Sequence, residues 1–285
     1  MKDPGSQWTI GQCAEMACLL ECLSPKPGNV HRGADFEDLS LLDFATSAVG
    51  IGKIIDAEKH ATVGELVERS VESSFELVQT NTNLGICLLI APLVHGCRQN
   101  RIEKEGVREA LSSLTKHDAA CVYRAIQLAQ AGGLGKVENA DVNDTPPDDL
   151  IEAMALARDR DLIARQYVNS FEDLFSQILP EFERQLARTT TTRAIVLTHL
   201  WTMARFPDSL IARKCGQQTA LQAAAMAQNA YDLSGSESEF VRAASDLDFW
   251  LRADGNRRNP GTTADLVCAV IFVALVNGTL KPRFT

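Results

Sequence analysis

The sequence lacks the features that mark several classes of protein. Its longest apolar run, residues 266–276, is far shorter than the ~20 residues that span a bilayer. Residues 1–7 are largely polar and contain no apolar core of a signal peptide. There is no Cys-x-x-Cys pair and no basic block, and 28 Lys and Arg against 37 Asp and Glu give a net charge of −9. We therefore expect no membrane or nucleic-acid partner, a cytoplasmic location and reduced cysteines.

The sequence also lacks the common nucleotide-binding and catalytic motifs. No Walker A, G-x-G-x-x-G, H-E-x-x-H or G-x-S-x-G pattern occurs in it. Its 285 residues, 45% of them hydrophobic, suffice to bury a core in one large domain or two ordinary ones. We favour a single domain over residues 1–285, with a long loop at 132–149 that contains Pro146-Pro147 and several Asp.

Apolar residues recur at helical spacing along most of the chain, and almost no segment alternates like a half-buried strand. The pattern predicts an all-α, multi-helical globular fold of roughly a dozen helices. The predicted helices cover residues 8–23, 39–55, 63–78, 84–97, 107–114, 119–129, 150–156, 168–186, 191–206, 209–215, 219–231, 237–251 and 264–276. Thr62 and Glu65 form a predicted capping box, and Pro92 is expected to break or kink its helix.

Five segments at helix ends or in loops interrupt this pattern with polar residues. In the first, residues 24–38, Pro and Gly favour a loop that presents Lys26, Asn29, His31, Arg32 and Asp35. Cations beside exposed backbone N–H groups suit a phosphate, and carboxylates suit Mg²⁺. A solvated turn, with Asp38 as the cap of the next helix, explains the same residues equally well.

The second and third segments precede helices. Asn81 and Asn83 lie just before the apolar run 86–94, where helix capping explains one Asn or Thr but not three. In the third segment, Asp144 lies in the predicted loop. Asp161 and Arg165 would be neighbours on one helix face, where the two side chains could simply pair with each other. A solvated charged face is the alternative for this segment.

The fourth and fifth segments combine acids and bases near helix ends. Asp208 is predicted in the first turn of a helix, and Arg213 and Lys214 in its last turn, an arrangement that also complements the helix dipole. The fifth segment opens the most apolar helix of the chain. The candidate site residues of this segment are Arg257, Arg258, Asn259, Gly261, Thr262 and Asp265. Such a helix start suits a phosphate, and an inward-facing Asp265 needs a partner or a metal.

These segments together resemble the triphosphoribosyl-dephospho-CoA synthase family, as a divergent branch. The matching stretches are Glu21 with 26–31, then 81–85, 160–165, 207–214 and 259–266. The resemblance implies an all-helical enzyme that joins the triphosphoribosyl group of ATP to the 2′-hydroxyl of 3′-dephospho-CoA and releases adenine. The better-known members carry Asp where this chain has His31, and His where it has Asn83.

With this resemblance, the polar residues receive expected roles. Glu21 or Asp144 would assist the attacking hydroxyl or the ribose cation, with His31 as a third catalytic candidate. Four carboxylates would organise Mg²⁺, namely Asp35, Asp161, Asp208 and Asp265. Substrate and phosphate contacts are expected from Lys26, Asn29, Arg32, Asn81, Asn83, Arg165, Arg213, Lys214, Arg257, Arg258, Asn259, Gly261 and Thr262.

Several alternatives remain open at the level of sequence. The branch could perform a related ribosyl or phosphoribosyl transfer, for example in the biosynthesis of a pterin-like C1 carrier. A metal-dependent hydrolase of nucleotides or ADP-ribose fits carboxylates in a helical bundle. A non-catalytic nucleotide-binding or scaffold protein is the third alternative. The expected partners are ATP and dephospho-CoA or a related acceptor, and a homodimer is left open.

Overall fold

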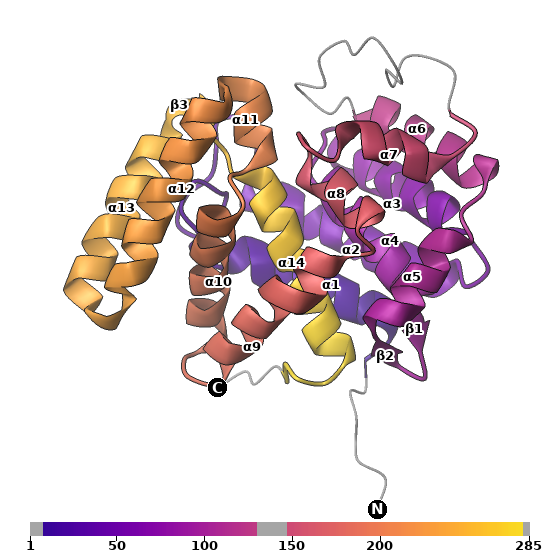
Figure 1. The fold of residues 1–285 in the computed structure, drawn as a ribbon, viewed down its shortest axis with the longest axis horizontal. Coiled ribbons are helices and arrows are strands. Elements are labelled where there is room, and N and C mark those ends of the chain that lie inside the picture. The colour runs from indigo at the N-terminus through magenta and orange to yellow at the C-terminus, as the bar shows by residue number, and fades with distance from the viewer. Residues whose placement is uncertain (1–7, 130–146, 282–285) are drawn as a thin grey trace, which may run out of the picture.

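The most apolar helix of the chain, α14 (Gly261–Val276), lies at the centre of the fold (Figure 1). Its residues from Leu266 to Val276 are all buried, because helices pack against it from several sides. The computed structural model describes residues 8–129 and 147–281, and these residues form an all-helical globular fold, as the sequence predicts. The predicted long loop falls largely outside the described residues.

The N-terminal half of the fold consists of six helices and a small hairpin. They are α1 (Ile10–Leu23), α2 (Leu41–Ala57), α3 (Val63–Val78), α4 (Leu84–His95), β1 (Cys97–Arg98), β2 (Arg101–Ile102), α5 (Lys104–Ser112) and α6 (Lys116–Ala129). The predicted capping box is confirmed, because Thr62 Oγ1 accepts from Glu65 N and the Glu65 carboxylate from Thr62 N. Pro92 lies inside α4, which continues to His95.

The C-terminal half combines short helices with the four long helices α10, α12, α13 and α14. Its elements are α7 (Leu150–Ala157), α8 (Leu162–Val168), the π-helix η1 (Leu174–Ile178), α9 (Leu179–Leu186), α10 (Thr191–Arg205), α11 (Ser209–Cys215), α12 (Gln217–Asp232), the 3₁₀ turn η2 (Leu233–Gly235), α13 (Glu237–Arg252), β3 (Ala253–Asn256) and α14. The prediction of one helix over 168–186 is wrong. Ser170 and Phe171 have positive φ angles of 54° and 59°, which end α8 and start a new helical segment.

A tight turn separates α4 from α5, where the sequence predicts helix as far as residue 97. Gln99 and Asn100 have φ angles of 51° and 60°, and they connect the antiparallel strands β1 and β2. Two successive positive φ angles match the twist of a two-residue hairpin. The strands are only two residues each, so this hairpin leaves the helical class of the fold unchanged.

Two hydrophobic cores meet at α10. The larger core surrounds α14 and includes apolar residues of α1 to α4, α6 and α9. The smaller core joins α10 and α11 to α12 and α13, which lie together at one side of the molecule (Figure 1). The loop 24–38 is held against α13. Gly28 N donates to Asp248 Oδ1 at 2.7 Å, and Arg252 donates to the carbonyl of Asn29.

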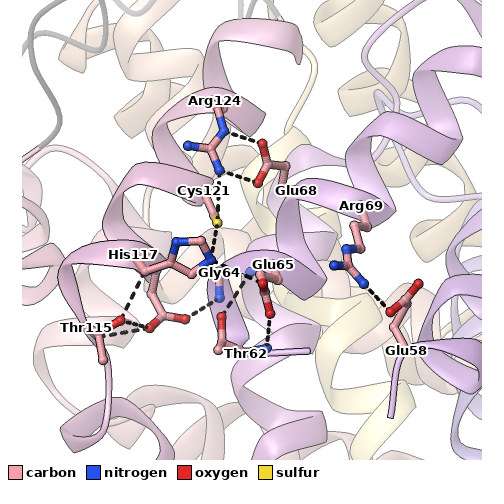
Figure 2. A network of polar contacts seen from close by, with 11 residues as sticks. Glu58, Thr62, Gly64, Glu65, Glu68, Arg69, Thr115, His117, Cys121 and Arg124 are labelled. Atoms are coloured by element: carbon pink, nitrogen blue, oxygen red, sulfur yellow. Dashed lines mark hydrogen bonds and ion pairs between the residues drawn. The ribbon is translucent and has the colours of Figure 1, made fainter. Parts of the chain in front are cut away.

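Charged side chains connect α3 to α6 outside the larger core (Figure 2). Arg124 and Glu68 form a bidentate pair, with 2.7 Å between Arg124 Nη2 and Glu68 Oε2. His117 Nε2 lies 3.2 Å from Glu65 Oε1, and Arg124 also contacts Cys121 Sγ at 3.1 Å. These contacts fix the relative positions of two helices that line the cavity described below.

Two expectations from the sequence concern the oxidation state of the cysteines and membrane-spanning helices. All eight cysteines are free, and those on α1 are buried in the core. Burial raises the pKa of the Cys22 thiol to about 12. Within residues 8–129 and 147–281, no helix is long and apolar enough to cross a membrane.

Candidate active site

A cavity of about 880 Å³ lies where loop 24–38 and the first turns of several helices meet. Polar walls come from α1, the start of α4, α8, α11 and α14, and apolar walls from α3, α6 and α7. The starts of α4, α8 and α14 lie at the cavity, and oxygens of Asn81, Asp161 and Asp208 accept hydrogen bonds from N–H groups of their first turns. Ten of the twenty predicted site residues line the cavity, namely Glu21, Asn29, Asn81, Asp161, Arg213, Lys214, Asn259, Gly261, Thr262 and Asp265.

Asp265 has the least compensated charge at the cavity. Burial raises the pKa of its carboxyl well above the usual range, and the neighbouring carboxylates of Glu21, Asp208 and Asp161 raise it further. Among the described residues no hydrogen bond or ion pair reaches this carboxylate. A methyl group on Gly85 would overlap Asp265 Oδ2 and lie 2.9 Å from Ile163 Cδ1. Glycine at position 85 therefore lets the start of α4 approach Asp265 closely.

Glu21 faces the same cavity with a dedicated counter-ion behind it. Lys26 is completely buried, and its Nζ lies 2.9 Å from Glu21 Oε1. The same ammonium donates to the Glu21 carbonyl and, at 3.4 Å, to the Ser24 carbonyl. Lys26 does not line the cavity, so in this structure its charge is used on Glu21.

Cations line the side of the cavity formed by α8 and α11. Asp161 caps α8 by accepting from Ile163 N at 2.9 Å and Ala164 N at 3.0 Å, and its second oxygen pairs with Arg213. Arg213 Nε is buried without a partner in the described chain. Lys214 is half-buried and makes no ion pair there. These groups retain donors for an anionic ligand.

Amides and a hydroxyl line the remaining polar wall. Asn29 Nδ2 donates to Asn259 Oδ1 at 2.6 Å, and Asn29 Oδ1 is buried without a partner in the described chain. Asn81 Oδ1 accepts from Leu84 N at 3.2 Å, and Ser209 Oγ contacts Thr262 Oγ1 at 3.1 Å. These amides lie where a substrate ribose or base could bind them.

Asp208 lies behind the cavity wall. It is the N-cap of α11, not a first-turn residue as predicted, and its Oδ1 accepts from Leu210 N and Ile211 N at 2.9 and 3.0 Å. Its Oδ2 accepts from the backbone and hydroxyl of Thr263 at 2.7 and 2.8 Å. Both oxygens thus connect the starts of α11 and α14.

The other predicted residues do not line the cavity, and several of them have partners elsewhere. Arg165 pairs with Asp173 at 2.9 Å, so the predicted Asp161–Arg165 pair does not form. Asp35 Oδ1 accepts from Leu41 N at 2.8 Å, and burial followed by the charge of Arg252 lowers the pKa of His31. The remaining ones are Arg32, Asn83, Arg257 and Arg258, and Asp144 lies outside the described residues.

Several lining residues were missed as site candidates from the sequence. Arg160 is exposed and lines the cavity next to Asp161, and its place at the start of the 160–165 motif was the available signal. Asp38 and Asn256 also line it, joined by a 2.7 Å hydrogen bond between Asn256 Nδ2 and Asp38 Oδ2. Nothing in the sequence signals this contact, because it joins segments over two hundred positions apart.

The residues present fit a Mg²⁺ ion only if it binds together with the phosphates of a nucleotide. No group of three or more His, Cys, Asp or Glu side chains is placed to hold a metal in the part of the chain that the structure describes. Mg²⁺ with a nucleotide, however, is usually held by one or two carboxylates, with phosphates and water as the other ligands. The unpaired carboxylate of Asp265 meets that requirement, whereas Asp208 and Asp161 already use their oxygens.

Comparison with known proteins identifies a family and a similar solved structure. The CitG family, described as ATP:dephospho-CoA triphosphoribosyl transferase, matches residues 7–284. The chain belongs to this family. A crystal structure described as a candidate triphosphoribosyl-dephospho-CoA synthase from Archaeoglobus fulgidus is 26% identical, covers 84% of this chain and 99% of its own, and superposes with a TM-score of 0.64. No curated protein matches the chain.

Membership of the CitG family agrees with the helical fold and with the motifs quoted from the sequence. All five of the matched stretches contribute residues to one cavity, although they lie far apart in the chain. A triphosphoribosyl transferase must bind an anionic triphosphate beside carboxylates, and the cavity offers cations, helix starts and two carboxylates with different surroundings.

Proposed function

We propose that this CitG-family protein transfers the triphosphoribosyl group of ATP to the 2′-hydroxyl of 3′-dephospho-CoA and releases adenine. The observation that carries this proposal is the cavity that Glu21 and Asp265 line together with the cations Arg160, Arg213 and Lys214. The family match supports the same reaction. It gives no support to hydrolysis, to transfer in pterin-type biosynthesis or to a scaffold role. A cytoplasmic location suits such a biosynthetic enzyme.

The triphosphate would bind at the α8 and α11 side of the cavity. Arg213 and Lys214 retain unused donors there, and Arg160 adds a third cation at the rim. The starts of α8 and α14 lie at the same space, and the carboxylates of Asp161 and Asp208 cap them. Fixed cations and dipoles suit a group that keeps all three phosphates through the reaction, because they need no rearrangement as the ribose bond breaks.

Glu21 would act at the ribose. When the bond to adenine breaks, positive charge develops on the anomeric carbon, and a nearby carboxylate stabilises it or accepts the proton of the attacking hydroxyl. The buried ammonium of Lys26, 2.9 Å behind the Glu21 carboxylate, holds this group in place at the wall. Glu21 is therefore a catalytic candidate, and Lys26 is a positioning residue.

Asp265 would hold Mg²⁺, with the remaining ligands from the triphosphate and water. The ion, when bound, supplies charge neutralisation for the phosphates. This role is consistent with a buried carboxylate that has no cation of its own in the described chain. Asp35 and Asp208 contribute less directly, because the first is exposed and the second is enclosed by backbone donors.

Product analysis tests the proposed function. Incubation with ATP, Mg²⁺ and dephospho-CoA should yield adenine and a triphosphoribosyl-dephospho-CoA detectable by mass spectrometry. Asp265→Asn should lower the rate by about 10²-fold or more, because the site loses the charge that binds the metal. Asp246→Asn, an exposed residue of α13, is the matched control and should be fully active. Adenine release without an acceptor would instead support hydrolysis.

A further inference from the structure

The cavity has an apolar half that the proposed chemistry does not use. Its walls are Phe44 of α2, Phe75 of α3, Tyr123 and Ile126 of α6, and Ala153 and Met154 of α7. These six residues are called the apolar half below. Tyr123 is buried, whereas the other five are partly exposed. Partly exposed apolar side chains from four helices on one cavity indicate a ligand surface.

The apolar half is continuous with the polar half that contains Glu21 and Asp265. Both belong to one cavity of about 880 Å³, near the top of the roughly 300–1,000 Å³ range of small-molecule sites. The segment between α3 and α4 lines the junction, with Gln79, Thr80, Asn81 and Thr82. A ligand that reaches the apolar half can therefore also reach the reacting centre.

The chemistry of transfer decides which substrate group fits each half. Adenine leaves with the electron pair of the broken bond, so its binding site needs hydrogen-bond donors or a proton source. The apolar half has few such groups, whereas the polar half has amides and cations. The triphosphate likewise requires cations, which are Arg160, Arg213 and Lys214 in the polar half. Neither the adenine nor the triphosphate of ATP therefore matches the apolar half.

The acceptor carries a part that does match it. Dephospho-CoA is an adenosine diphosphate joined to the uncharged pantetheine arm, which alternates methyl and methylene groups with amides. Burying such methylene groups against apolar side chains is favourable. The hydroxyls and amides at the junction suit the arm's amides. Asn81, for example, uses its Oδ1 on Leu84 N, and its Nδ2 has no partner in the described chain.

We propose that the apolar half binds the pantetheine arm of the acceptor and so selects dephospho-CoA over plain adenine nucleotides. This inference rests on the proposed function for the identity of the acceptor. It places the arm between α3, α6 and α7 and leaves the reacting 2′-hydroxyl at the junction with the polar half, close to the wall that holds Glu21.

Binding measurements on the full-length protein test the inference. Ala153→Phe fills the apolar half, and Phe75→Ala removes a wall of it. Each variant should weaken dephospho-CoA binding by about tenfold or more in calorimetry, equivalent to ~1.4 kcal/mol, and leave ATP binding within about twofold. Pantetheine 4′-phosphate, which has the arm without the adenosine, should lose affinity in parallel. Retained ATP binding also reports that each variant is folded.

The matched controls lie on the same helices. Ala155→Phe on α7 and Leu77→Ala on α3 change residues that do not line the cavity, so both should bind dephospho-CoA like the parent. Equal weakening of ATP and dephospho-CoA would assign the apolar half to adenine and overturn the inference. Unchanged dephospho-CoA binding in both cavity variants, or none in the parent, would overturn it too. Selective weakening without any transfer product would retain the inference and refute the proposed function.

Discussion

At the scale of single residues, Glu21 and Asp265 differ in what balances their charge. Glu21 has a buried ammonium 2.9 Å away, while Asp265 has only the start of α4 and distant cations. An enzyme separates the roles of two acids by giving them different surroundings. This difference agrees with the proposal that Glu21 acts at the ribose and that Asp265 binds a cation that arrives with the substrate.

The role of Lys26 can be separated from phosphate binding by its effect on stability. Lys26→Met leaves the Glu21 carboxylate buried without its counter-ion, and removing one partner of a buried ion pair costs about 3–5 kcal/mol. We therefore expect urea unfolding to show a large loss of stability. The double variant Lys26→Met with Glu21→Leu should recover much of it, because no unpaired charge remains. A stable Lys26→Met protein with weak ATP binding would instead identify Lys26 as a phosphate ligand.

At the scale of elements, the contact between α4 and α14 determines how far Asp265 projects. Gly85→Ala would place a methyl group on Asp265 Oδ2, so the helices must separate or the carboxylate must turn. We expect at least about tenfold loss of transfer and weaker Mg²⁺–ATP binding in calorimetry. Gly235→Ala, where a methyl group meets nothing within 4 Å, is the control. A fully active Gly85→Ala protein would contradict the placement of Asp265 in the site.

The junction of α3 and α6 predicts a pH dependence of stability. Asp118 accepts from Gly64 N at 2.8 Å and from the backbone and hydroxyl of Thr115 at 2.9 and 2.7 Å. Burial alone would raise the pKa of Asp118, but these hydrogen bonds outweigh it and lower the pKa. Its stabilisation is therefore complete above the unfolded pKa of about 3.9 and disappears as pH falls through the lower folded value.

Asp118→Asn measures that contribution. We expect this substitution to lower the free energy of unfolding by about 1.5–3 kcal/mol at pH 7. Below pH ~4 the difference in stability between variant and parent should become smaller, since the parent then loses the same charge. Chemical denaturation at several pH values would show this convergence. Asp246→Asn, exposed on α13, should keep the parent's stability at every pH. A constant difference between parent and Asp118→Asn would refute the charge-based explanation.

At the scale of the whole molecule, the helical fold follows from local patterns. The bounds of α3 and α11 match the predicted ranges, because caps and apolar periodicity lie within each segment. The inward position of Asp265 also followed from its apolar neighbours. The break at Ser170 and Phe171 did not, because positive φ at a buried Phe depends on packing against distant helices.

The site was less predictable than the fold because long-range contacts decide what each charged residue faces. Residues such as Lys26 and Asp208 have the composition of a phosphate or metal site, yet both lie behind the wall of the cavity. Which side of a loop a lysine faces depends on what packs over it. For loop 24–38 this is α13, over two hundred positions away.

The central position of α14 has a consequence for synthesis of the protein. The helix that completes the larger core, and the loop anchor on α13, come near the end of the described chain. During translation, α1 and α4 therefore leave the ribosome long before α14, one of the helices they pack against, is made. Until then the apolar residues that they bury against α14 stay uncovered, and exposed apolar surface on a nascent chain favours the binding of chaperones. Catalytic competence would then appear abruptly, after the final helix is made.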